Sequence, residues 1–270
     1  MRTLRSPIRV GERILMFGVS GTRKTSSALD IARRCVDAKF YVLDNEGQSY
    51  ERLLWTEYVD VAERGNYEIE NVWMDEWEPY VPTIQRWRKT AGANDWLVVD
   101  SITRTWPAVQ SWYYEQVFGA GTSAHLMELR KAARDEKDYK KNLAIDNAWD
   151  VINPSYMRLY TEIMKWPGHV YLVADQKEYD AKNATKEQQA NYSILGVMPA
   201  GQKQLPNIPQ TVLHAEKNRA GVAMLTTVKD RGRESMSAVA VEDFATDYLV
   251  AVAGWKIVKI DDDAGAGDES

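Results

Sequence analysis

Residues 18–25 read Gly-Val-Ser-Gly-Thr-Arg-Lys-Thr, which is the pattern G-x-x-x-x-G-K-[ST] with Arg23 in place of the second glycine. In a loop of this kind the backbone N–H groups surround phosphate oxygens. The amine of Lys24 reaches the terminal phosphates, and the hydroxyl of Thr25 holds Mg²⁺. The stretch therefore predicts a phosphate-binding loop for a nucleoside triphosphate.

The segments on both sides support this prediction. Residues 13–18 are an apolar run that ends at a glycine, as a buried parallel strand does, and an amphipathic helix follows Lys24. The helix N-terminus adds partial positive charge beside a bound phosphate. The residues expected to contact the nucleotide are Gly18, Val19, Ser20, Gly21, Thr22, Arg23, Lys24, Thr25 and Ser26.

Arg23 departs from the pattern at a position where glycine gives the backbone unusual freedom. Its side chain either strains the loop, points outward, or lays its guanidinium against the phosphates. This departure bears on turnover more than on nucleotide binding.

Length and composition fit one large α/β domain of a soluble protein. No apolar run approaches the ~20 residues that span a bilayer, and the N-terminus has no apolar signal core, so we expect a cytoplasmic protein without membrane contact. The single Cys35 fits a reducing compartment. Five acids lie in residues 261–270, which we expect to be a disordered acidic tail. The tail either solubilises the chain, competes with DNA, or recruits a protein partner.

The remaining chain predicts strands separated by helices, followed by a late hairpin. We expect strands at 40–44, 69–74, 96–100 and 169–175, and a hairpin from 211–216 and 222–228. We expect helices at 81–90, 109–118, 124–138 and 148–165, the last interrupted by Pro154, and a surface loop at 177–205. This pattern predicts an α/β fold with a mostly parallel central sheet flanked by helices and an antiparallel C-terminal hairpin extension.

Three polar residues follow buried strands and are candidates for the chemistry. Asp100 is placed to orient Mg²⁺, although a strand-ending aspartate also starts turns. Glu46 is the best candidate to activate water, the other interpretation being a carboxylate at a helix start. Gln176 either senses a γ-phosphate and relays its presence into residues 177–205, or lies at the surface.

A basic pair follows the predicted hairpin. Lys229 and Arg231 are two apart on an extended segment and project the same way. Such a pair can stabilise charge on a transferred phosphoryl group when a neighbouring subunit offers it. On residues alone, an exposed basic turn is the simpler interpretation.

Taken together, these segments resemble the RecA-like ATPase superfamily of recombination proteins, most closely the short RecA-like NTPases encoded by bacteriophages. The resemblance covers roughly residues 10–235. It rests on the phosphate loop, Leu-Asp-Asn-Glu-Gly at 43–47, Leu-Val-Val-Asp-Ser at 97–101, Ala-Asp-Gln at 174–176 and Thr-Val-Lys-Asp-Arg-Gly at 227–232, in that order.

The resemblance implies an ATPase that uses ATP and Mg²⁺, with Glu46 as the catalytic carboxylate. It implies that Lys229 and Arg231 act in the neighbouring subunit's site, hence a homo-oligomeric ring or filament. Single-stranded DNA would contact parts of 101–125 and 177–205, in recombination, annealing or replication. The expected organisation is one ATPase domain, residues 1–260, with a helical insertion around 103–166.

Two other functions stay open. A nucleotide-binding scaffold would follow if Arg23 blocked turnover, and a P-loop kinase would transfer phosphate to an acceptor with little dependence on Lys229.

Overall fold

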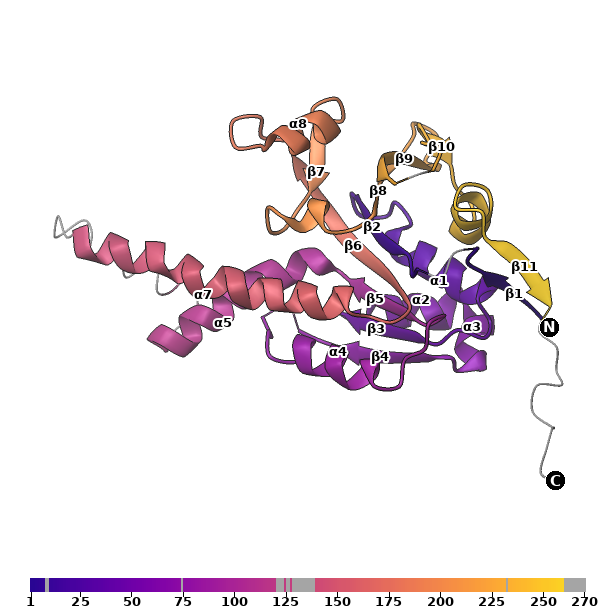
Figure 1. Ribbon diagram of the computed structural model, residues 1–270, viewed down its shortest axis with the longest axis horizontal. Helices are drawn as coiled ribbons and strands as arrows, with labels where there is room; N and C mark the ends of the chain where they lie inside the picture. Colours follow the sequence, from indigo (N-terminus) through magenta and orange to yellow (C-terminus); the bar gives the residue numbers. More distant parts are fainter. Residues whose placement is uncertain are drawn as a thin grey trace, which may run out of the picture.

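The computed structural model describes residues 1–7, 10–73, 75–119, 124, 127, 139–231 and 233–259, and helices alternate with strands along most of them (Figure 1). The strands are β1 (Arg2–Arg5), β2 (Arg13–Gly18), β3 (Phe40–Asp44), β4 (Tyr67–Asn71), β5 (Trp96–Asp100), β6 (His169–Glu178), β7 (Val197–Pro199), β8 (Thr211–Lys217), β9 (Ala223–Asp230), β10 (Val239–Ala240) and β11 (Lys256–Lys259). The helices are α1 (Lys24–Arg34), α2 (Ser49–Thr56), α3 (Val59–Arg64), α4 (Tyr80–Arg88), α5 (Thr105–Phe118), α7 (Tyr139–Met164) and α8 (Lys186–Tyr192). Two 3₁₀ turns, η1 (Ile102–Arg104) and η2 (Leu205–Asn207), and a π-helix, η3 (Ala245–Val250), complete them.

One large sheet organises the molecule. Its strand order is β10-β9-β8-β2-β6-β5-β3-β4, and β2 lies between β6 and β8, parallel to both. The pairs β5–β6, β3–β5 and β3–β4 are also parallel, whereas β8 and β9 form an antiparallel hairpin. The predicted α/β fold, with a mostly parallel sheet and an antiparallel extension near the C-terminus, is therefore confirmed.

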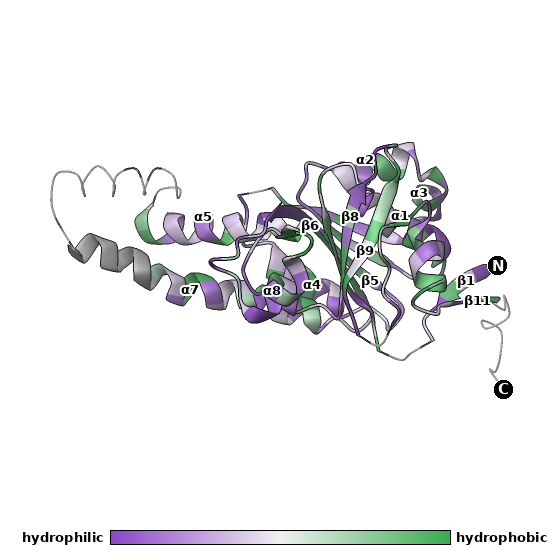
Figure 2. Cartoon of the chain, turned by 90° about the horizontal axis from the view of Figure 1, so that it is seen from above, coloured by the Kyte–Doolittle hydropathy of each residue, from purple (hydrophilic) through white to green (hydrophobic). Residues whose placement is uncertain are grey.

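Helices cover both faces of the sheet because its central strands are apolar on both sides. In β3, Phe40 and Val42 pack into one core with α1, α2, α3 and η3. Tyr41 and Leu43 of the same strand pack into the other core with α4, α5 and α7. Figure 2 shows the two groups of helices on opposite sides of the strands, and α5 and α7 extend side by side beyond the sheet.

The parallel strands give the sheet two chemically distinct edges. We call the edge at which they end the carboxyl edge; Gly18 of β2 lies beside Asp175 of β6, and Asp100 of β5 beside Asp44 of β3. The amino edge, at which the same strands begin, includes Glu12 and His169. Strand β9 runs antiparallel to β8, so Asp230 lies opposite Thr211 at the amino edge.

Several boundaries differ from those predicted. Strand β4 is Tyr67–Asn71 rather than 69–74, and α5 begins at Thr105, four residues before the predicted start. Helix α7 runs through Pro154 without interruption. A proline inside a helix costs one hydrogen bond and some crowding, about 3 kcal/mol. Burial of Ile152 and Tyr156, both fully buried on the side facing the sheet, outweighs that cost.

Residues 177–205 are more structured than the predicted surface loop. Strand β6 continues to Glu178 and pairs there with β7, and α8 lies between them. The side chain of Thr185 caps α8 by accepting from the N–H of Gln188, whose side chain accepts in return from the N–H of Thr185. The sequence Thr-Lys-Glu-Gln at 185–188 is a capping box, a local signal for this helix.

Most of the predicted helix 124–138 and the acidic tail 261–270 lie outside the described residues. Across the part of the chain that the structure describes, no helix combines the length and the apolar character needed to cross a membrane.

Candidate functional site

The loop of residues 18–23 joins the carboxyl end of β2 to the first turn of α1. Close packing fixes its start, because a Cβ on Gly18 would lie 2.0 Å from the carbonyl oxygen of Ala215. The Thr22 hydroxyl donates to the carbonyl of Val19 at 2.8 Å and closes the loop on itself. The free N–H groups at the start of α1 and the helix dipole favour an anion here.

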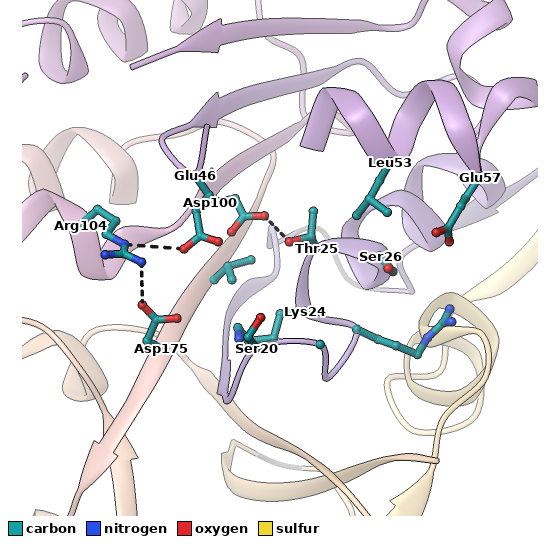
Figure 3. A pocket seen from close by; sticks show the side chains of 13 residues that line it. Ser20, Lys24, Thr25, Ser26, Glu46, Leu53, Glu57, Asp100, Arg104 and Asp175 are labelled. Atoms are coloured by element: carbon teal, nitrogen blue, oxygen red, sulfur yellow. Dashed lines mark hydrogen bonds and ion pairs between the residues drawn. The ribbon is translucent and has the colours of Figure 1, made fainter. Parts of the chain in front are cut away.

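A pocket of about 430 Å³ lies against this loop at the carboxyl edge (Figure 3). Its lining combines loop and α1 residues, acidic side chains from the strand ends, and residues of α2 and η1. They are Ser20, Gly21, Arg23, Lys24, Thr25, Ser26, Glu46, Leu53, Glu57, Asp100, Arg104, Val173 and Asp175. Of the predicted loop contacts, Gly18, Val19 and Thr22 support the loop from outside this lining.

Lys24 is the buried cation of the pocket, with 8% of its surface exposed. Its Nζ donates to the carbonyls of Gly18 and Val19, each at 2.8 Å. Burial lowers the pKa of the amine, and the carboxylates of Asp175, Asp100 and Glu46 oppose that shift. The amine is therefore held at the mouth of the loop, on the side of the acidic strand ends.

Thr25 and Asp100 meet inside the pocket. The Thr25 hydroxyl donates to Oδ2 of Asp100 at 2.5 Å, and Asp100 is fully buried. Burial raises the pKa of Asp100 to about 7, against the hydrogen bond from Thr25, which lowers it. Its Oδ1 is buried without a hydrogen-bond partner among the described residues. A hydroxyl beside an unsatisfied carboxylate oxygen is an oxygen donor set that suits Mg²⁺, so the two residues fit the predicted metal.

Glu46 reaches the same pocket from the turn that follows β3 (Figure 3). Burial and the nearby Asp175 raise the pKa of its carboxyl group, whereas Arg104 and Lys24 lower it. Asp44 holds the turn, because its carboxylate accepts from the N–H groups of Glu46 and Tyr50 at 2.9 and 2.8 Å. Asp44 thus positions Glu46 and is absent from the pocket lining.

Arg23 adopts the left-handed conformation that glycine has at such a position, with φ 66° and ψ 16°. Its side chain turns to the buried Asp30, with Nη2 3.1 Å from Oδ2. Asp30 also accepts from the Tyr58 hydroxyl at 2.7 Å and from the N–H of Phe244 at 3.1 Å. This ion pair holds the guanidinium against α1, and Arg23 remains part of the pocket lining.

Gln176 lies apart from the pocket. Successive residues of a strand point to opposite faces, and Asp175 is the one that lines the pocket. The side-chain oxygen of Gln176 instead lies 3.1 Å from Nε2 of the buried His214 on β8. The carboxylate of Asp175 therefore occupies the place predicted for the amide of Gln176.

Lys229 and Arg231 also lie away from the pocket of their own chain. Lys229 is near the end of β9, at the amino edge, with Nζ donating to the carbonyl of Asn207 at 3.1 Å. Arg231 follows β9 and is exposed. The structure brings Lys24, Thr25, Glu46 and Asp100 together and leaves this basic pair at the opposite edge.

The sequence analysis missed five pocket residues: Leu53, Glu57, Arg104, Val173 and Asp175. Asp175 had a usable signal, since it ends the parallel part of a buried strand next to β2. Arg104 follows Asp100 by four residues, within reach of the same strand end. Leu53 and Glu57 depend on how α2 packs beside α1, which no local pattern specifies.

Several solved structures align with most of this chain, at low sequence identity. The crystal structure of the RadB recombinase aligns with a TM-score of 0.48 and 15% identity, over 87% of this chain and 90% of that chain. A prototypical ATPase from the type III secretion system of pathogenic bacteria aligns with a TM-score of 0.43 and 14% identity, over 80% of this chain and 57% of that one. The ATP synthase subunit NeqB from Nanoarcheaum equitans aligns with a TM-score of 0.42 and 10% identity, over 78% and 46%.

A comparison with protein families gives a match over most of the chain. Among curated proteins, no sequence matches the chain. Residues 11–235, however, match the family AAA_24, described as an AAA domain. The match begins before β2 and ends after β9, so it includes the phosphate loop, Glu46, Asp100 and the basic pair. The chain therefore belongs to this AAA domain family, with the fold and phosphate loop of a P-loop NTPase.

Proposed function

We propose that the protein is a Mg²⁺-dependent ATPase of the RecA-like type. The observation that carries this proposal is the convergence of Lys24, Thr25, Asp100 and Glu46 on one pocket at the N-terminus of α1. An amine, a hydroxyl and two carboxylates at a phosphate loop are the groups that phosphoryl transfer to water requires.

The chain's own residues supply binding and proton transfer. Loop N–H groups and the Lys24 amine bind the β- and γ-phosphates, and Glu46 takes a proton from the attacking water. The water oxygen bonds to the γ-phosphorus, and the bond from that phosphorus to the β–γ bridging oxygen breaks, so ADP leaves with the electron pair. Magnesium held by Thr25 and Asp100 would neutralise charge on the phosphates.

Lys229 and Arg231 are proposed to complete the site of a neighbouring copy. In their own chain they are at the amino edge, whereas the phosphate loop is at the carboxyl edge. A contribution to catalysis therefore requires a second copy, which supports a homo-oligomeric ring or filament.

The DNA part of the proposal rests on the order of motifs that resembles phage RecA-like recombination proteins. Single-stranded DNA would contact parts of residues 101–125 and 177–205, and the protein would act in the host cytoplasm. One hydrogen-bonded connection between these two segments and the pocket supports this assignment. The hydroxyl of Thr103 accepts from the N–H of the pocket residue Asp175 at 2.9 Å and donates to the carbonyl of Ala200 at 3.3 Å. Residues 1–260 are proposed to form one ATPase domain with a helical insertion around 103–166 and an acidic tail that contacts a protein partner.

The position of Arg23 favours this function over a scaffold without turnover. Its guanidinium pairs with Asp30 on α1, and the backbone takes the dihedral angles that glycine would take. No observation favours a P-loop kinase.

The test measures ATP hydrolysis with and without single-stranded DNA, together with DNA binding at low salt. Glu46→Gln should lower the rate at least about a hundredfold while ATP still binds, and Lys24→Ala should abolish binding. Arg86→Ala is a matched control, because Arg86 forms an exposed ion pair with Glu70 outside the pocket. Absence of hydrolysis in the wild type would refute the ATPase, and absence of DNA binding at low salt would refute only the DNA part.

A further inference from the structure

Arg104 is a pocket residue that no motif of the chain predicts. It ends η1, the turn between β5 and α5, and its side chain extends between Glu46 and Asp175 (Figure 3). Its backbone is fixed, because its N–H donates to the carbonyl of Ser101 at 3.2 Å. The adjacent Thr105 is fully buried, and its hydroxyl donates to the carbonyl of Ile102 at 2.6 Å. The side chain of Arg104 can therefore change its interaction partners while the backbone of η1 stays in place.

The guanidinium of Arg104 is only loosely held by its two carboxylates. Its Nε lies 3.7 Å from Oε1 of Glu46, and Nη2 lies 3.9 Å from Oδ2 of Asp175. Charge-assisted hydrogen bonds between such groups are about 2.7–2.9 Å long. The Nε is also buried and has no hydrogen-bond partner among the described residues. A buried donor without an acceptor is costly, which indicates that this nitrogen serves a ligand.

The charges around the pocket explain why a terminal phosphate needs this residue. Glu46, Asp100 and Asp175 all face the region in front of the loop. The Lys24 amine already donates to two carbonyls. Arg23 also has a buried Nε without a partner among the described residues, but its guanidinium is paired with Asp30 on α1. Arg104 is the lining cation, within the described residues, that combines an unused donor with contact to the carboxylates. Without it, Glu46 and Asp175 would repel a γ-phosphate.

We propose that Arg104 recognises the γ-phosphate in cis, by exchanging its ion pairs with Glu46 and Asp175 for hydrogen bonds to the terminal phosphate. The exchange has two consequences. It makes the pocket prefer a triphosphate over a diphosphate, and it releases Glu46 from its cation so that the carboxylate can accept a proton from water. This inference rests on the proposed ATPase function and assigns a specificity role that differs from the role of Arg231 in trans.

The experiment measures equilibrium binding of ADP and of the non-hydrolysable analogue AMP-PNP, both with Mg²⁺, to the full chain. Arg104→Ala should weaken AMP-PNP binding about tenfold or more, because it removes charge-assisted hydrogen bonds to the terminal phosphate, while ADP affinity stays within about twofold. Arg104→Lys should be intermediate, because lysine keeps the charge and loses the fork of donors. Arg86→Ala should change neither affinity, and circular dichroism with thermal unfolding verifies that each variant is folded.

A second comparison tests the exchange itself. Asp175→Asn removes one of the groups that compete for Arg104, so it should strengthen AMP-PNP binding by up to about fivefold. The size of this effect should differ when Arg104 is already alanine, because Asp175 then repels the phosphate but no longer competes for Arg104. Equal effects of Asp175→Asn in both backgrounds would show that Asp175 acts directly on the phosphate, which contradicts the exchange.

The outcomes separate this inference from the proposed function. If Lys24→Ala abolishes binding of both nucleotides but Arg104→Ala leaves the AMP-PNP to ADP ratio unchanged, the role of Arg104 is refuted and the nucleotide site stands. If Arg104→Ala weakens both nucleotides equally, the residue has a general electrostatic role and the inference is wrong. If the wild type binds neither nucleotide, both the proposed ATPase function and the role of Arg104 are refuted.

Discussion

The nucleotide pocket at the carboxyl edge and a cluster around Glu12 at the amino edge differ in how their buried polar groups are hydrogen-bonded. At the carboxyl edge, Oδ1 of Asp100 and Nε of Arg104 are buried without hydrogen-bond partners among the described residues. At the amino edge, Oε1 of the buried Glu12 accepts two hydrogen bonds, from Nη2 of Arg233 at 2.6 Å and from Nε1 of Trp255 at 3.1 Å. Its N–H donates to Nδ1 of His169 at 2.9 Å.

This difference separates groups kept for a ligand from groups that hold the fold together. Asp100 and Arg104 both line the nucleotide pocket, where a ligand can satisfy their unpaired atoms. Saturated buried atoms stabilise the fold and have no capacity left for a ligand. Substitutions at the carboxyl edge should therefore change nucleotide binding or turnover, and those in the Glu12 cluster, formed by Glu12, His169, Arg233 and Trp255, should change stability.

The largest expected effect tests whether the amino edge also has a catalytic task through Arg231. Arg231→Ala should lower turnover about a thousandfold, the lower range for loss of an arginine that stabilises the transferred phosphoryl group. Mixing it with an equal amount of Lys24→Ala should restore about a quarter of the wild-type rate, because random neighbours form one intact interface in four. A steady-state ATPase assay measures both. No restoration on mixing would refute action in trans.

The next effect concerns pH and the Glu12 cluster. Burial, together with Arg13 and Arg5, lowers the pKa of His169 to about 3 from an ordinary 6.5, so the folded protein holds the imidazole neutral. The resulting stability is complete above pH 6.5 and is lost as pH falls toward 3, by on the order of 5 kcal/mol. NMR titration of the His169 ring should show no protonation at pH 5. A midpoint near 6.5 would contradict this.

Glu12→Ala should destabilise the fold by about 3 kcal/mol, because it removes the nearer of the two carboxylates that face the largely buried Arg233. Glu12→Gln keeps an acceptor and should cost less. Urea unfolding gives the free energies of unfolding. AMP-PNP affinity at a temperature where both variants are folded should stay at the wild-type value; a parallel loss of affinity would remove the distinction between the edges.

The smallest effect is expected at Arg23, which has both an ion pair, with Asp30, and a buried Nε without a partner among the described residues. Arg23→Gly relieves the left-handed conformation but removes the ion pair with Asp30, so we expect a net loss of about 1 kcal/mol in the free energy of unfolding. Nucleotide affinity should be kept, and the ATPase rate should change by less than about threefold. A large gain in rate with glycine would instead support the scaffold without turnover.

Much of the fold could be predicted because its signals are local. The runs at residues 13–18, 40–44 and 96–100 have apolar interiors, and their charged residues stand only at the first or last position. Each run forms a strand of the sheet as expected. The helix at Pro154 and the segment 177–205 were predicted wrongly. In the first case tertiary burial outweighed a local penalty, and in the second a short capping box was the only local sign.

The sequence by itself determined the phosphate loop, the strands that surround it, and the carboxylates at their ends. Parallel strands carry those ends to one edge whatever the packing details, so Lys24, Thr25, Glu46 and Asp100 meet as the motif order predicts. Only the tertiary structure decided that Asp175 rather than Gln176 lines the pocket, that Arg23 turns to Asp30, and that Arg104 lies between two carboxylates. Those choices depend on strand register and on the packing of side chains from distant segments, which leave no periodic signal in the chain.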